Sequence, residues 1–272
     1  MSGVWRRAAA LPGEHGAWAF LLTPLAIGLF AGGRWTIVSL YLVVAVLCGF
    51  LIRHPITLLI RIYSGRRSRD LLAAAWFWAA VYAVIGLLHV LGMVMRGFGY
   101  LLYLSIPGVP VFLWSLYLVS RRAERHQWPV EVAAVGVLSL SAPAAYWIAL
   151  GRPEPLGWVL WVLVWAEAVA MIVYTYLRLA QRTLQRPPAP AEWLRMWWGS
   201  LLIATANLGA ALALSLADVV PRWLFLPYAF LCAEVLWGVY RPAVGLKPTA
   251  IGYRQLAVTA AYTILFILTW RL

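Results

Sequence analysis

The chain has 272 residues, of which 64% are hydrophobic and 11% are charged, and its mean hydropathy is +0.83. A soluble domain of this length needs charged residues at about a quarter of its composition, so a soluble protein is excluded. The net charge of +13 does not indicate a nucleic-acid partner, because the arginines lie in short gaps between apolar runs and not on one soluble face.

Nine apolar runs follow one another along the chain, and each is long enough to cross a hydrocarbon core of ~30 Å as a helix. They cover residues 16–33, 35–52, 71–93, 98–119, 129–150, 155–179, 198–217, 221–240 and 252–270. The sequence therefore predicts an all-α polytopic membrane helix bundle with about nine transmembrane helices. We expect one integral membrane domain over residues 1–272, with the lipid bilayer as its first partner.

Two local features modify this pattern. The fourth run contains Pro107 and Pro110 on either side of a glycine, which predicts a kinked or broken helix. The gap after the second run contains an apolar stretch at residues 54–61, which predicts a short separate helix at the membrane interface.

The basic residues alternate strictly between the two sides of the predicted bundle. Of the 22 lysines and arginines, 17 lie at the N-terminus or in every second gap, and five lie on the opposite side. The last of the basic gaps contains Arg241, Lys247 and Arg254. By the positive-inside rule this pattern predicts a cytoplasmic N-terminus and an external C-terminus, and it supports the count of nine.

Ionisable groups inside the membrane are costly, so each is a functional candidate. Glu167 lies in the middle of the sixth run and Glu234 within the eighth. Helical spacing places Glu167, Met171, Tyr174 and Arg178 on one stripe that leads to the basic side. Asn207 lies at mid-depth in the seventh run. The alternative, favoured for Asn207, is that these groups only hydrogen-bond neighbouring helices and hold the bundle together.

A second set of candidates lies at the basic ends of the helices. Glu14 and His15 stand where the first helix begins, and a helix N-terminus attracts anions. Capping and anchoring at the interface are the alternative role for this pair. Arg53, His54 and Arg61, with Arg66, Arg67 and Arg69, could bind an anionic head group or a phosphate. The alternative is that they only set the topology, and it is favoured for Arg66, Arg67 and Arg69.

Several well-defined motifs are absent from the sequence. It has no Walker loop, no G-x-G-x-x-G, no C-x-x-C and no H-E-x-x-H. The aspartates, Asp70 and Asp218, have no partner at ligand spacing, so no metal site is predicted. The sequence leaves the cofactor unknown, and haem is disfavoured because His15, His54 and His89 cannot all lie at one depth.

Two short segments carry a family resemblance. Pro-Gly-Glu-His-Gly-Ala-Trp at residues 12–18 resembles the N-terminal signature of the bacterial YwiC-like membrane family, and Lys-Pro-Thr-Ala-Ile-Gly at residues 247–252 resembles that family's Lys-Pro-x-x-Ile-Gly segment. The hydropathy profile fits along the full chain. The resemblance implies a multi-pass protein of the bacterial cytoplasmic membrane, and it implies no particular activity.

The chain is also similar, more distantly, to the UbiA-type intramembrane prenyltransferases. These have nine helices, a cytoplasmic N-terminus and functional loops after the second and sixth helices, where the longest basic gaps lie here. That superfamily holds Mg²⁺ and diphosphate with aspartate-rich motifs in both loops. Arg53, His54 and Arg61 stand at the first place and Tyr174 and Arg178 at the second, so the charge is inverted. The similarity implies a UbiA-like arrangement without standard prenyl transfer.

Three functions remain open at this stage. The first is a binding protein or divergent enzyme that holds a lipophilic anion, of isoprenoid or quinone type, in a pocket open to the cytoplasm. The second is a small proton-coupled transporter with Glu167 and Glu234 as proton sites. The third is a structural or assembly subunit of a membrane complex.

Overall fold

The computed structural model of the chain describes residues 6–12, 15–123, 127–184 and 190–272, and for Arg7, His15 and residues 190–192 it describes the backbone alone. The described residues form helices joined by turns and contain no strand. The elements are α1 (Arg7–Ala10), α2 (His15–Gly32), α3 (Ile37–Tyr63), η1 (Arg69–Leu71), α4 (Leu72–Met93), η2 (Val94–Phe98), η3 (Gly99–Ser105), α5 (Gly108–Ser120), α6 (Trp128–Ser139), α7 (Ser141–Leu150), α8 (Pro155–Gln181), α9 (Pro190–Leu216), α10 (Phe225–Tyr240) and α11 (Pro248–Arg271).

The helices confirm the predicted membrane bundle. Six apolar helical segments are long enough to cross a bilayer: Ile37–Tyr63, Arg69–Ser105, Trp128–Leu150, Pro155–Gln181, Trp193–Leu216 and Pro248–Arg271. Three shorter apolar helices, Gly16–Gly32, Gly108–Ser120 and Phe225–Tyr240, complete the set found in the described part of the chain. Together these segments correspond to the nine apolar runs of the sequence.

The fourth predicted run is broken, as its prolines indicate. The 3₁₀ helix η3 has 7 residues and α5 has 13, and residues 106–107 separate them. At the usual rises per residue the two pieces together reach roughly 34 Å, enough for the hydrocarbon core. The break therefore divides one membrane crossing into two short helices.

A second break, between α6 and α7, was not predicted. Pro143 is the third residue of α7 and has no N–H to donate to the carbonyl of Ser139. At the break the Leu140 N–H donates to the Val137 carbonyl, three residues before it, so the helical turn is tighter there. The fifth crossing is therefore α6 and α7 in succession.

The predicted interfacial helix at residues 54–61 is wrong. These residues continue α3, which runs unbroken for 27 residues with Pro55 inside it. Leu58, Leu59 and Ile62 of this extension are buried in an apolar cluster with Ala74 and Ala75 of α4. This burial stabilises the extension although Pro55 removes one helical hydrogen bond.

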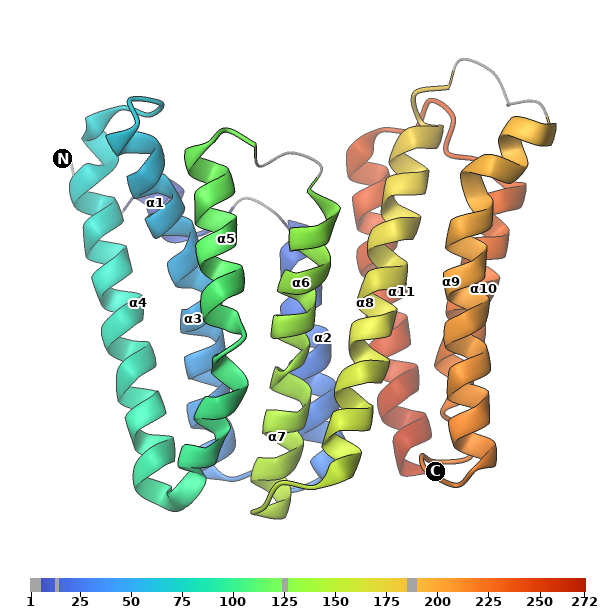
Figure 1. The fold of residues 1–272 in the computed structure, drawn as a ribbon, viewed down its shortest axis with the longest axis horizontal. Coiled ribbons are helices and arrows are strands. Elements are labelled where there is room, and N and C mark those ends of the chain that lie inside the picture. The colour runs from blue at the N-terminus through green and yellow to red at the C-terminus, as the bar shows by residue number, and fades with distance from the viewer. Residues whose placement is uncertain (1–5, 13–14, 124–126, 185–189) are drawn as a thin grey trace.

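The bundle is broad, and its helices are spread along its long axis, although not in chain order (Figure 1). Helices α3, α4 and α5 lie at one side of the view, α8 to α11 at the other, and α2, α6 and α7 between them. The largest apolar core lies where α2 packs against α7 and α11. This contact is close, because a Cβ atom added at Gly28 of α2 would lie 2.7 Å from the Ala142 Cα of α7.

The helix ends that precede the predicted basic gaps lie together. The C-terminal ends of α3, α5, α8 and α10 are at the same end of the bundle as α1, and the C-terminus of the chain is at the opposite end (Figure 1). We call the former the basic end. The positive-inside rule predicts that it faces the cytoplasm.

Candidate functional site

The first group of polar side chains joins α8, α10 and α11 near the basic end. Glu234 of α10 forms a bidentate ion pair with Arg254 of α11, in which Nε and Nη2 each lie 2.7 Å from a carboxylate oxygen. The Tyr174 hydroxyl of α8 donates to Glu234 Oε1 at 3.2 Å and approaches its backbone carbonyl at 3.0 Å. Gly238 makes room for the tyrosine ring, because a Cβ there would lie 2.7 Å from its Cε2. We call Tyr174, Glu234 and Arg254 the ion-pair cluster.

Arg178 and Gln181 lie one turn beyond this cluster and are both buried. Arg178 Nη1 donates to the carbonyls of Gly238 and Arg241 at 3.1 and 2.7 Å, and to Gln181 Oε1 at 3.0 Å. Gln181 Oε1 also accepts from the Ala243 N–H at 3.2 Å. The last carbonyls of a helix lack intrahelical partners and attract cations. Arg178 thus caps the C-terminal end of α10, which is a structural role.

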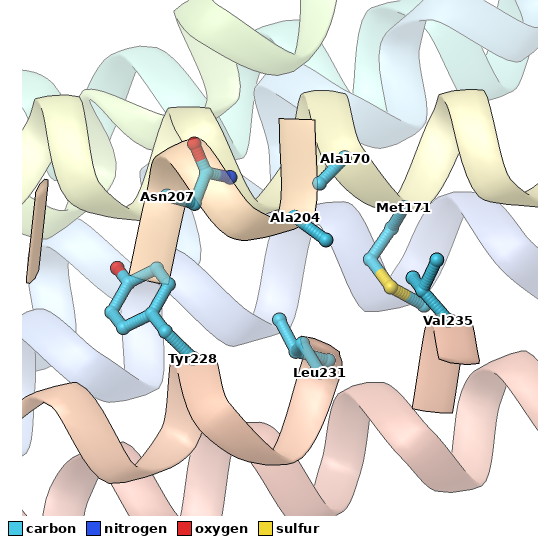
Figure 2. A pocket seen from close by; sticks show the side chains of 7 residues that line it. All are labelled: Ala170, Met171, Ala204, Asn207, Tyr228, Leu231 and Val235. Atoms are coloured by element: carbon cyan, nitrogen blue, oxygen red, sulfur yellow. The ribbon is translucent and has the colours of Figure 1, made fainter. Parts of the chain in front are cut away.

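Two polar residues lie deeper in the same part of the bundle. Glu167 is 2% exposed, and its Oε1 has no hydrogen-bond partner among the described residues. Asn207 of α9 donates to the Ala166 carbonyl of α8 at 2.8 Å, which is a contact between helices. A cavity of about 10 Å³ lies beside this contact, between α8, α9 and α10 (Figure 2).

The second group of polar side chains surrounds a larger cavity at the basic end, between α1, α3 and η1. We call it the basic pocket. Its volume is about 110 Å³, and its lining residues are Ala8, His54, Thr57, Leu58, Arg61, Arg67 and Leu71. His54 Nε2 lies 3.0 Å from the Ala8 carbonyl, which can only accept, so this nitrogen carries the hydrogen. The bond holds α1 against α3.

The structure does not gather the predicted residues into one pocket. His54 and Arg61 line the basic pocket on α3, whereas Glu167, Tyr174 and Arg178 belong to α8. Helices α2, α6 and α7 lie between the two groups along the long axis of the bundle (Figure 1). The bundle therefore has two separate polar regions.

The remaining predicted residues have the following places. Arg53 is exposed and does not line the basic pocket. Glu14 lies outside the described residues, and His15 begins α2 with its side chain outside the description. The anion site predicted for Glu14 and His15 stays a prediction.

Sequence reasoning missed Arg254, Gln181 and Thr57 as site residues, and for Arg67 it favoured a role in setting the topology. Arg254 was assigned to a gap, but Pro248 is the first residue of α11, so Arg254 lies in the second turn of a membrane helix. A proline at the first helical position is a known start signal and could have placed this arginine. The other three residues carry no such signal, because only the packing of α1, α3, η1 and α8 brings them to their sites.

The described residues contain no group of three or more histidine, cysteine, aspartate or glutamate side chains that could hold a metal ion. The region of α8, α9, α10 and α11 has arginine, hydroxyl and amide donors with single carboxylates, and the basic pocket has arginine, hydroxyl and imidazole groups. Such groups bind anions and protons.

Comparison with known proteins identifies the family to which these regions belong. A family model described as "YwiC-like protein" matches residues 11–146, which is half of the chain and includes the lining of the basic pocket from His54 to Leu71. A relative from Bacillus subtilis (strain 168), named "Uncharacterized protein YwiC", is 25% identical over 154 residues. That match covers 57% of this chain and 60% of the relative, which is less than two thirds of the relative's length. No solved structure matches the chain, so the UbiA-like arrangement stays a prediction.

Proposed function

This chain belongs to the YwiC-like protein family, and we propose that it binds a lipophilic anion, with the anionic head group in the basic pocket. The protein is a multi-pass membrane protein, and polar side chains surround a cavity at its basic end. The ligand is of isoprenoid or quinone type. The pocket opens to the cytoplasm.

The observation that carries the proposal is the chemistry of the pocket lining. Arg61 and Arg67 supply guanidinium groups, which bind phosphate and carboxylate oxygens in pairs. Thr57 adds a hydroxyl and His54 an imidazole. No carboxylate is among the lining residues in the described part of the chain. A site with this set of donors attracts an anion and repels a cation.

The size of the pocket and the leucines that line it favour an amphiphilic ligand. A cavity needs roughly 10–15 Å³ to hold one water, so about 110 Å³ leaves room for a larger group such as a phosphate. Leu58 and Leu71 line the pocket and also belong to the apolar cluster between α1, α3 and α4. An anionic head group can therefore contact the arginines while adjoining apolar atoms contact the leucines.

Native mass spectrometry of the purified full-length protein tests the proposal. We expect a retained lipophilic anion that is lost in Arg67→Ala and in Arg61→Ala/Arg67→Ala. Arg69→Ala is the matched control, because Arg69 is exposed in the same segment and does not line the pocket. Arg67 is itself exposed, so its replacement leaves the fold intact.

Added inorganic phosphate distinguishes a lipid head group from free phosphate. A free-anion site would bind phosphate in the wild type and not in Arg67→Ala, and no lipid would be displaced when the phosphate binds. Recovery of bulk phospholipid alone, equal in wild type, Arg67→Ala and Arg69→Ala, would contradict the proposal. A stoichiometric protein partner with an empty pocket would instead support the assembly-subunit hypothesis.

A further inference from the structure

Glu167 and Glu234, two glutamates within membrane helices, have opposite surroundings. Glu234 has a bidentate arginine partner and a tyrosine donor. Glu167 forms no ion pair with any described residue, and its Oε1 is buried without a hydrogen-bond partner. The transporter hypothesis places proton sites at both residues, but Glu234 already has a cationic partner. Glu167 is left as the carboxyl available for protonation.

An ionised carboxylate cannot remain at such a position. Moving an unpaired charge from water into an apolar interior costs several kcal/mol even after relaxation, so the group binds a proton instead. Glu167 packs in a core built from α2, α7, α8, α10 and α11, with side chains such as Val164, Leu163 and Leu160 on its own helix buried beside it. The geometry thus favours the neutral acid.

The groups that face Glu167 are hydroxyls and an amide. The Tyr228 hydroxyl of α10 donates to the Leu163 carbonyl, one helical turn before Glu167, at 3.0 Å, and it accepts from the Tyr262 hydroxyl of α11 at 2.9 Å. On α9, the amide of Asn207 lies at this depth, where it donates to the Ala166 carbonyl. The polar groups on the other helices packed against α8 are engaged elsewhere: Thr23 of α2 with Thr263, Glu131 of α6 with Tyr176, and Tyr146 of α7 with Trp270. The charged Glu234 and Arg254 lie nearer the basic end.

A water-sized cavity lies beside Asn207 and Tyr228. Figure 2 shows these two residues at one end of the cavity and Met171 and Val235 at the other. Met171 and Val235 are further along α8 and α10 toward the basic end, so the second end of the cavity lies on the side of the ion-pair cluster. The volume of about 10 Å³ admits one water and no larger ion or solute.

We propose that Glu167 is an exchangeable proton-binding site, reached from the basic end through the cavity between α8, α9 and α10. A protonated water in the cavity passes a proton to the Tyr228 hydroxyl, whose own hydrogen turns from the Leu163 carbonyl to the Glu167 carboxylate. Each transfer breaks one O–H bond and forms another, so no oxidant or reductant is needed. The site is independent of the basic pocket, and either proposal can fail alone.

Infrared spectroscopy of the full-length protein in detergent tests the site directly. At neutral pH we expect the C=O stretching band of a protonated carboxylic acid, and a shift of this band in D₂O as its proton exchanges. Glu167→Gln should abolish the band. Glu131→Gln is the matched control, because it removes a carboxyl group at the basic end of α6, where the Tyr176 hydroxyl lies 2.8 Å from each of its two oxygens.

Two further variants test the route without removing the carboxyl. Tyr228→Phe deletes the relaying hydroxyl, and Ala204→Val fills the cavity that Ala204 lines. Both should keep the band and slow its shift in D₂O. A band that is absent from wild type, survives Glu167→Gln or never shifts in D₂O would overturn the proton site, and unchanged exchange in both route variants would overturn the path.

Discussion

The ion pair between Glu234 and Arg254 should couple α10 to α11 measurably. Arg254→Met leaves the Glu234 side chain, 9% exposed, with the Tyr174 hydroxyl as its remaining side-chain donor. Glu234→Gln removes the buried charge while it keeps the shape. The double variant Glu234→Gln/Arg254→Met removes both charges, so it lacks the unpaired carboxylate that makes the arginine variant costly.

The expected magnitude follows from the burial of the two partners. Breaking a fully buried pair costs about 3–5 kcal/mol, whereas exposed pairs are worth about 0–1 kcal/mol. Arg254 is 43% exposed and Glu234 is 9% exposed, so this pair lies between the two classes. We expect about 2 kcal/mol of destabilisation for Arg254→Met and a double variant within about 1 kcal/mol of wild type.

Thermal unfolding in detergent, followed by the fluorescence of the 17 tryptophans, measures the effect. A loss of about 2 kcal/mol corresponds to a drop in Tm of roughly 4–8 °C for a domain of this size. Lys247→Met is the matched control, because it removes an exposed positive charge at the first turn of the same helix. A double variant as unstable as the sum of both single variants would refute the reasoning.

Two further predictions concern packing. Gly28→Ala places a Cβ against the backbone of Ala142, which cannot rotate away, so we expect destabilisation of about 3 kcal/mol in the same unfolding assay. Gly49→Ala, with open space around the new atom, should be neutral, and equal effects of the two variants would contradict the close packing of α2 on α7. Tyr82→Phe removes the 2.9 Å bond from the buried Tyr82 hydroxyl to the Ala10 carbonyl and should cost about 1 kcal/mol. Limited proteolysis should then cut near α1 faster, and unchanged cleavage would show that this bond does not hold α1.

Much of the fold could be predicted because the bilayer imposes simple rules. Backbone groups cannot be left without partners in hydrocarbon, so each long apolar run must form a helix. This rule, with the spacing of the arginines, predicts the helix order, the break near Pro107 and the common basic end. The rule does not predict that packing keeps α3 unbroken at Pro55, nor that a break near Pro143 divides one membrane crossing into α6 and α7.

The candidate site was predicted only in part. Helical spacing correctly placed Glu167, Tyr174 and Arg178 on one buried stripe of α8. It could not show that Arg178 caps α10, that Arg254 pairs with Glu234, or that Glu167 has no such partner among the described residues, because each of these facts depends on which helix lies opposite.

The amino-acid order alone therefore determined that this is a multi-pass helical membrane protein with one basic end, since hydrophobicity and charge act residue by residue at the membrane boundary. The tertiary structure decided which polar side chains meet. Distance across the bundle separates His54 and Arg61 from Tyr174 and Glu234, and it is packing between helices, which no single segment encodes, that turns one expected pocket into two regions.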